Sequence, residues 1–190
     1  MIEVRRETKE TQISVKLNLY GTGKAKIHTG VGFYDHMLEA FTKHAHIDME
    51  VSCIGDTHID DHHTVEDVAI VIGQALKKAI YPVQSIERFG NATVVMDESS
   101  VTCDIDLSNR GYLVFELPIG GKVGDFDVEL VEEFFKAFAF NLPLTLHLIY
   151  NRGKNKHHII EGAFKALAVA LRRAVTVNEN AGIPSTKGVL

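Results

Sequence analysis

Residues 61–80 read DHHTVEDVAIVIGQALKKAI, and residues 156–175, which lie 95 positions further along, read KHHIIEGAFKALAVALRRAV. Both segments carry the pattern His-His-x-x-Glu, and later Ala, Leu and Ala positions also coincide. Self-similarity at a fixed spacing indicates an internal duplication. Because the repeated positions include imidazole and carboxylate groups, we expect the two copies to share a metal chemistry.

The spacing of apolar residues around these segments predicts the same order of elements in each half of the chain. The predicted strands are 13–19, 47–53, 93–96, 101–107, 112–117 and 145–149, and the predicted helices are 33–43, 62 to just before Pro82, 130–141 and 157–175. Asp61 is a candidate N-cap for the second of these helices. Glycine-rich 120–124 is predicted to be a turn, and 182–190 to be irregular.

This pattern predicts an α+β fold built from internally duplicated half-domains. Each half is expected to be a small mixed β-sheet covered by helices on one face. We place the halves at residues 1–90 and 91–190, and expect them to form one catalytic domain.

Composition narrows the class of protein. A net charge of −5 over 190 residues argues against a general nucleic-acid binder. No apolar run reaches 18 residues, and the first residues lack the apolar region of a signal peptide. Cys53 and Cys103 are isolated, which favours two reduced, buried thiols. We therefore expect a cytoplasmic protein with neither membrane nor nucleic acid as a partner.

The histidine pairs have the geometry of metal ligands. At 100° per residue, Glu66 projects about 40° from His62, and His63 about 100° from it, so all three share one side of the first helical turn. The same holds for the second copy. With one histidine from a preceding helix and one from a strand, the chain supplies ligands for two sites of three imidazoles and one carboxylate. These candidates are His36, His62, His63, Glu66, His147, His157, His158 and Glu161. Such sites suit Mn²⁺, Fe²⁺ or Zn²⁺.

Longer motifs carry a resemblance to a known family. They are GFYDHML (32–38), GDTHIDDHHTVED (55–67), MDE (96–98), DLSNR (106–110), TLH (145–147), NKHH (155–158) and PSTKG (184–188). In this order they resemble imidazoleglycerol-phosphate dehydratase over essentially the whole chain. The resemblance is to the monofunctional form, because 190 residues leave no room for the phosphatase domain of bifunctional members.

The resemblance implies a hydro-lyase of histidine biosynthesis that converts D-erythro-imidazoleglycerol phosphate to imidazole acetol phosphate. It also implies two Mn²⁺ ions per active site and a homo-oligomer of 24 chains, built from trimers, with metal sites at subunit interfaces. The proton that is removed is not next to a carbonyl, so the imidazole ring is the available electron sink. Two metals would favour its imidazolate form, and loss of hydroxyl would give a diazafulvene-like intermediate.

We assign the ligands to two metals. One metal is expected to bind His36, His63, His157 and Glu161, and the other His62, Glu66, His147 and His158. Exchanges within each histidine pair are equally allowed by helix geometry, and a metal could be shared between subunits. We expect metal binding to drive assembly, because unpaired interface ligands would repel.

The resemblance also implies the substrate contacts. The positions matching those that bind phosphate are Arg88, Arg110, Lys165, Ser185 and Lys187. Glu10, in the segment RETKET (6–11), is the candidate general base and a further substrate contact. The residues expected to act directly in the chemistry are Glu10, His36, His63 and His158. The C-terminal tail is expected to become ordered over bound substrate.

Two other functions fit the same ligands. A two-metal phosphomonoester hydrolase also uses paired His and carboxylate sites. A non-catalytic metal-binding assembly would use the clusters to bridge subunits and would have no need for the phosphate-binding set.

Overall fold

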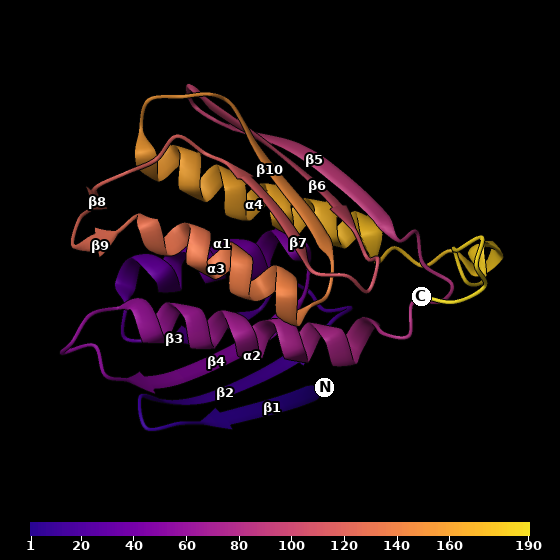
Figure 1. The fold of residues 1–190 in the computed structure, drawn as a ribbon, viewed down its shortest axis with the longest axis horizontal. Helices are drawn as coiled ribbons and strands as arrows, with labels where there is room; N and C mark the ends of the chain where they lie inside the picture. Colours follow the sequence, from indigo (N-terminus) through magenta and orange to yellow (C-terminus); the bar gives the residue numbers. More distant parts are fainter.

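The computed structural model describes residues 1–190 as two four-stranded β-sheets with four long helices between them, and a small two-stranded sheet (Figure 1). The first half contains β1 (Ile2–Glu7), β2 (Thr11–Asn18), β3 (Ala25–His28), α1 (Gly32–Ala45), β4 (Asp48–Gly55) and α2 (His62–Ile80). The second half contains β5 (Phe89–Met96), β6 (Ser99–Asp106), β7 (Tyr112–Glu116), β8 (Lys122–Val123), β9 (Phe126–Asp127), α3 (Glu129–Asn141), β10 (Thr145–Arg152) and α4 (Lys156–Ala174), followed by the short helix η1 (Glu179–Ala181).

The two sheets have the same topology. Their strand orders are β1-β2-β4-β3 and β5-β6-β10-β7. In each sheet the last pair, β4 with β3 and β10 with β7, is parallel, and the other pairs are antiparallel. The predicted α+β fold with duplicated mixed sheets is therefore confirmed. The second sheet begins at Phe89, so it includes the last residues of the segment that we assigned to the first half.

Three strand regions were not predicted. β1 and β3 each bury a single side chain, Val4 and Ile27, so neither shows the apolar alternation that marks a half-buried strand. The β8–β9 hairpin begins inside the segment 120–124 that was predicted to be a turn and extends beyond it, and its strands have two residues each. Gly121 and Gly124 have positive φ angles of 78° and 58°, which glycine adopts without strain.

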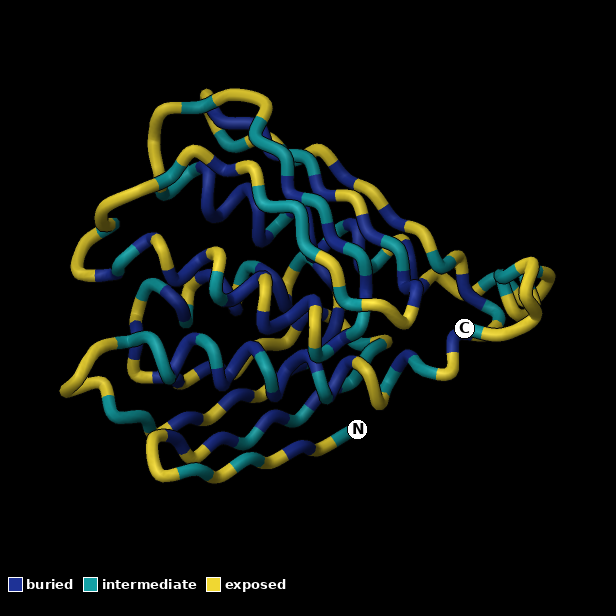
Figure 2. The backbone as a smooth tube through the Cα atoms, viewed as in Figure 1, coloured by how far each residue is buried: buried dark blue, intermediate teal, exposed yellow.

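One core joins the two halves. Buried residues line the helices and the inner faces of both sheets. Along the strands these buried residues alternate with less buried ones, which lie on the outer faces of the sheets (Figure 2). The helices pair across the halves, because α1 packs on α4 and α2 packs on α3. Both predicted thiols are buried. Burial raises the pKa of Cys53 to about 11 and that of Cys103 well above its ordinary value, so both stay protonated at neutral pH.

None of the four long helices combines the length and apolar character that crossing a membrane requires. The cytoplasmic location stays a prediction.

Phe134 on α3 lies at the contact between the two halves, so replacing it tests how much this contact stabilises the fold. Its ring centroid lies 5.7 Å from that of Tyr34 on α1 and 4.7 Å from that of Phe164 on α4, and the residue is 1% exposed. We expect Phe134→Ala to lower the free energy of unfolding by about 3–5 kcal/mol. Urea denaturation at equal protein concentration measures this. Phe140→Ala is the control, since Phe140 is 58% exposed on the same helix and should change stability by less than about 0.5 kcal/mol. Equal denaturation midpoints for both variants would contradict the prediction.

Candidate active site

The two histidine pairs lie in the first turns of α2 and α4, as predicted. At both helix starts a nearby side chain accepts a hydrogen bond from the first backbone N–H groups. Asn155 accepts hydrogen bonds from the backbone N–H groups of His157 (2.9 Å) and His158 (3.4 Å). At α2 the capping oxygen belongs to Asp60, which accepts from the N–H of His62 at 2.8 Å. Asp61 occupies the N-cap position that we predicted, but its side chain forms no capping bond. Ordered first turns fix the directions of the imidazole rings.

One compact cluster of potential ligands forms between the halves. The ligand atoms of His36 on α1 and of His157 and Glu161 on α4 all lie within 4.8 Å of one another. Glu161 Oε2 is 3.2 Å from His36 Nε2 and 3.0 Å from His157 Nε2. Two imidazoles and one carboxylate suit Mn²⁺, Fe²⁺ or Zn²⁺.

Lys165 forms an ion pair with the carboxylate of this cluster. Its Nζ lies 2.6 Å from Glu161 Oε1, one helical turn away. Burial raises the pKa of Glu161, but Lys165 and the His157 and His36 side chains lower it by more, so the net pKa lies below its usual value. Glu161 is therefore a carboxylate at neutral pH, which is the form that binds a metal.

The first copy of the motif forms a looser pair. His62 Nε2 and Glu66 Oε2 lie 3.6 Å apart, and both side chains are partly exposed. This pair lies at the beginning of α2, at the same end of the molecule as the beginning of α4 (Figure 1).

The second histidine of each pair is held between two carboxylates. His63 Nδ1 donates to Asp56 at 2.9 Å, and its Nε2 lies 3.8 Å from Glu10 Oε1. The hydrogen bond to Asp56 raises the pKa of His63. A carboxylate bonded to Nδ1 fixes the ring and leaves Nε2 available for a metal or substrate.

The second half repeats this arrangement. His158 Nδ1 donates to Glu98 at 2.8 Å, and its Nε2 lies 3.8 Å from Asp97. Backbone N–H donors from Asn155, the His158 ring and the N–H of Lys154 hold the pKa of Glu98 far below its usual value. Asp97 and Glu10 are therefore counterparts, since each comes from the turn that joins the first two strands of its half.

A single chain does not bring either expected set of four ligands together. Within the first set, His63 lies apart from the compact cluster, next to Asp56 and Glu10. Within the second set, His158 on α4 lies beside Asp97 and Glu98 of the β5–β6 turn. His147 lies on the outer face of the second sheet, because its neighbours Leu146 and Leu148 point into the core. The assignment of ligands to two metals stays a prediction.

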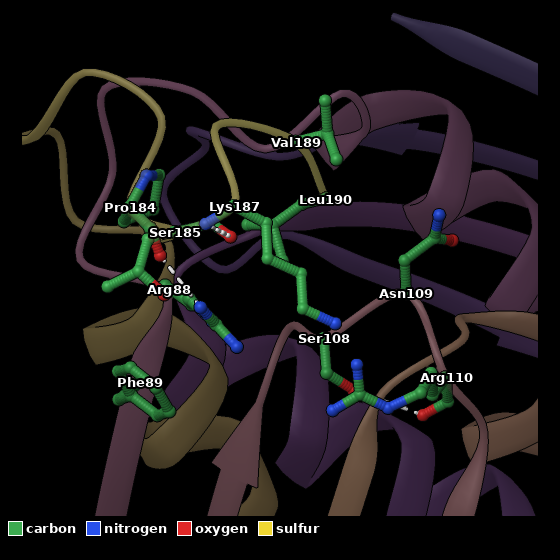
Figure 3. Close-up of a pocket in the computed structure, with 11 residues that line it drawn as sticks. Arg88, Phe89, Ser108, Asn109, Arg110, Pro184, Ser185, Lys187, Val189 and Leu190 are labelled. Atoms are coloured by element: carbon green, nitrogen blue, oxygen red, sulfur yellow. Dashed lines mark hydrogen bonds between the residues drawn. The ribbon is translucent and has the colours of Figure 1, made fainter.

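Four of the five predicted phosphate-binding residues line one cavity of about 770 Å³. These are Arg88, Arg110, Ser185 and Lys187. The side chains of Arg88, Arg110 and Lys187 point toward one another across this cavity (Figure 3). Ser108 and Asn109 also line it, although we predicted no role for them beyond their place in the DLSNR motif.

Arg88 connects the C-terminal tail to the sheet. Its guanidinium donates to both carboxylate oxygens of Asp106 (2.7 and 3.1 Å) and to the carbonyl of Pro184 (2.7 Å). Arg88 is thus paired, whereas Arg110 and Lys187 form no ion pair within the chain. Two unpaired cations in one cavity favour an anion.

The cavity and the compact cluster lie at opposite ends of helix α4. The N–H of Arg88 donates to the carbonyl of Ala174 at the last turn of α4, while His157 lies in its first turn. At 1.5 Å per residue, these two turns are about 25 Å apart. Lys165 lies with the cluster, and His147 lies toward the cavity end of its strand.

Comparison with known proteins assigns the family. The family model described as imidazoleglycerol-phosphate dehydratase matches residues 29–171. The chain belongs to the imidazoleglycerol-phosphate dehydratase family. The imidazoleglycerol-phosphate dehydratases of Sulfurovum sp. (strain NBC37-1) and Aliarcobacter butzleri (strain RM4018) are 90% and 66% identical to it over 190 residues, with full coverage of both chains.

Solved structures of imidazoleglycerol-phosphate dehydratases have the same fold. The crystal structure from Staphylococcus aureus aligns with a TM-score of 0.83 and 40% identity, covering 93% of this chain and 99% of that one. The structure from Pyrococcus furiosus, in complex with (S)-C348, aligns with a TM-score of 0.86 and 39% identity, covering 98% and 100%. The resemblance found from the motifs is confirmed.

Proposed function

We propose that this chain catalyses the Mn²⁺-dependent dehydration of D-erythro-imidazoleglycerol phosphate to imidazole acetol phosphate. Membership of the family supports a dehydratase of histidine biosynthesis. The observation that carries the metal dependence is the compact cluster of His36, His157 and Glu161, whose ligand atoms lie within 4.8 Å of one another. Bound Mn²⁺ would act as a Lewis acid toward the imidazole ring of the substrate.

The protein side chains would supply the remaining functions. Arg110 and Lys187 would bind the phosphate, with Ser185 as a hydroxyl donor. Glu10 would accept the proton from carbon, because its carboxylate is 53% exposed and lies 3.8 Å from His63. The tail that carries Ser185 and Lys187 would close over the substrate and exclude water.

The separation of cluster and cavity supports an active site shared between copies of the chain. The three-carbon chain that joins imidazole to phosphate is far shorter than the distance of about 25 Å along α4. A substrate held by one chain's cluster must therefore have its phosphate in the cavity of another. His147 fits this arrangement, since it lies partly exposed on the outer sheet face toward the cavity end. We propose the 24-chain assembly of trimers, with two Mn²⁺ per site, from the resemblance to the family, and a site shared between chains agrees with it.

The function is tested by assaying chelated protein with and without added Mn²⁺. We expect chelation to abolish formation of the ketone product and Mn²⁺ to restore it. Inorganic phosphate release without the ketone would favour the phosphomonoester hydrolase. Bound Mn²⁺ with no turnover would favour the non-catalytic assembly, and either result would reject the proposal. Sizing the chelated protein tests whether metal drives assembly, and an intact large assembly without metal would contradict it.

A further inference from the structure

Asp67 is a buried carboxylate that the proposed mechanism does not use. It lies on α2 four residues after His63, so the two side chains share a helical face one turn apart. The Asp67 side chain is 10% exposed. A carboxylate removed from water in this way needs partners that replace its hydration.

Those partners lie on both sides of the β1–β2 turn. Asp67 Oδ2 accepts from the hydroxyl of Thr11 at 2.5 Å. Asp67 Oδ1 lies 3.2 Å from Arg6 Nε and 3.1 Å from Arg6 Nη2. Arg6 lies near the end of β1 and Thr11 is the first residue of β2, so this one carboxylate ties both ends of the turn to α2.

The same turn carries Glu10 and holds its backbone. The hydroxyl of Thr8 accepts from the N–H groups of Glu10 (3.1 Å) and Thr11 (3.0 Å). The carbonyl of Glu10 accepts from the N–H of Asp56 at 3.1 Å, and the Asp56 carboxylate accepts from His63. The backbone of Glu10 is therefore held relative to His63 by these bonds, and Asp67 ties the same turn to α2 a second time.

The second half of the chain lacks this connection. Its turn is shorter, with only Asp97 and Glu98 between β5 and β6. The carboxylate of Glu98 holds that turn by accepting from the N–H groups of Lys154 and Asn155. The position four residues after His158 is Gly162, where an added Cβ would lie 3.7 Å from Val101, an ordinary contact. An acidic group in this position is thus specific to the half that carries Glu10.

We propose that Asp67 is a positioning residue that holds Glu10 beside His63, in the place from which it would accept the proton of the substrate. The proposal rests on the proposed function, in which Glu10 is the base. The physical reason is that displacing a reacting group by about 1 Å can lower a rate by about 100-fold. Asp67 acts through Thr11 and the turn, and touches neither metal nor substrate.

The test is a double-mutant cycle of Asp67→Asn with Glu10→Gln in the Mn²⁺-loaded assembly. Asparagine keeps the size of the side chain but cannot accept hydrogen bonds on both terminal atoms. We expect Asp67→Asn to lower kcat by about 10- to 100-fold, with KM changed by less than about threefold and metal content unchanged. In the Glu10→Gln background the same change should lower kcat by less than about twofold, since the group that it positions is gone.

Asp48→Asn is the matched control. Asp48 also fixes a loop, because its carboxylate accepts from the N–H groups of Thr22 (2.8 Å) and Lys24 (3.0 Å), but it lies at the opposite end of β4 from Asp56. We expect this variant to keep the kcat of the unchanged protein. If Asp67→Asn does not fold, Thr11→Val removes the same hydrogen bond, keeps the Arg6 pair and is expected to give the same cycle.

Different failures have different meanings. Unchanged kcat in Asp67→Asn or in Glu10→Gln would overturn the proposal, as would an equal loss in both Glu10 backgrounds, which is the result of a merely structural role. These results leave the dehydratase function in place. No dehydration by the unchanged protein with Mn²⁺ bound would instead overturn the proposed function, and the positioning role with it.

Discussion

Replacing Glu10 with glutamine is expected to lower kcat by about 10²- to 10⁴-fold, the contribution typical of a general base. Glutamine has the shape of glutamate but cannot accept a proton. Glu10 lies outside the compact ligand cluster, and its side chain is 53% exposed, so removing its charge should leave bound metal unchanged. Steady-state kinetics on the Mn²⁺-loaded protein, with metal content measured on the same sample, gives both quantities.

Glu7→Gln is the control for Glu10. Glu7 is the last residue of β1, next to the same turn, and it is exposed. It should therefore keep the turnover of the unchanged protein. Unchanged turnover in Glu10→Gln would remove Glu10 from the mechanism. A loss of turnover together with a loss of bound metal would instead show that Glu10 acts as a metal ligand.

Two variants that are inactive alone are expected to regain activity when they assemble together. Glu161→Gln damages the cluster at one end of the chain, and Arg110→Ala removes a cation from the cavity at the other. Each should lower turnover by at least about 100-fold. If each site takes its cluster and its cavity from different chains, random mixing in equal amounts leaves about a quarter of sites with both intact.

Co-expression of the two variants with different affinity tags provides the mixed assembly. Turnover near a quarter of that of the unchanged protein would support the shared site. The control is the mixture of Glu161→Gln with His36→Ala. Both changes damage the same cluster, so every cluster in the mixed assembly carries one of the two changes and no activity should return. Mixed Glu161→Gln and Arg110→Ala assemblies that are no more active than either variant alone would contradict a site shared between chains.

The sequence predicted the repeated unit well because its signals are local. The apolar spacing of α2 and α4 and the alternation in β2 and β4 each reflect one face buried on the core. The first strand of the first half was harder. β1 buries only one side chain, so its place in the sheet comes from pairing with β2 rather than from its own pattern.

The candidate site was predictable in its residue types but only partly in its arrangement. Helix geometry placed Glu161 beside His157, because both lie on one turn. The contact of His36 with Glu161 depends on α1 packing against a helix of the other half, which no local pattern reveals. The role of Asp67 could likewise not be predicted from the sequence, since its partners Arg6 and Thr11 lie more than fifty positions away.

The pairing of helices across the halves also constrains how such a chain could arise. One half alone would leave the apolar faces of its two helices in water, and two identical halves could cover them by exchanging partners. An ancestral half would thus have existed as a symmetric dimer. Joining two such halves through the linker between Ile80 and Phe89 would turn that association into the closure of a short loop. Fusion would also let equivalent positions diverge. Lys165 in the second half, for example, occupies the position that Ile70 has in the first, so the two halves of one chain can carry different functional residues.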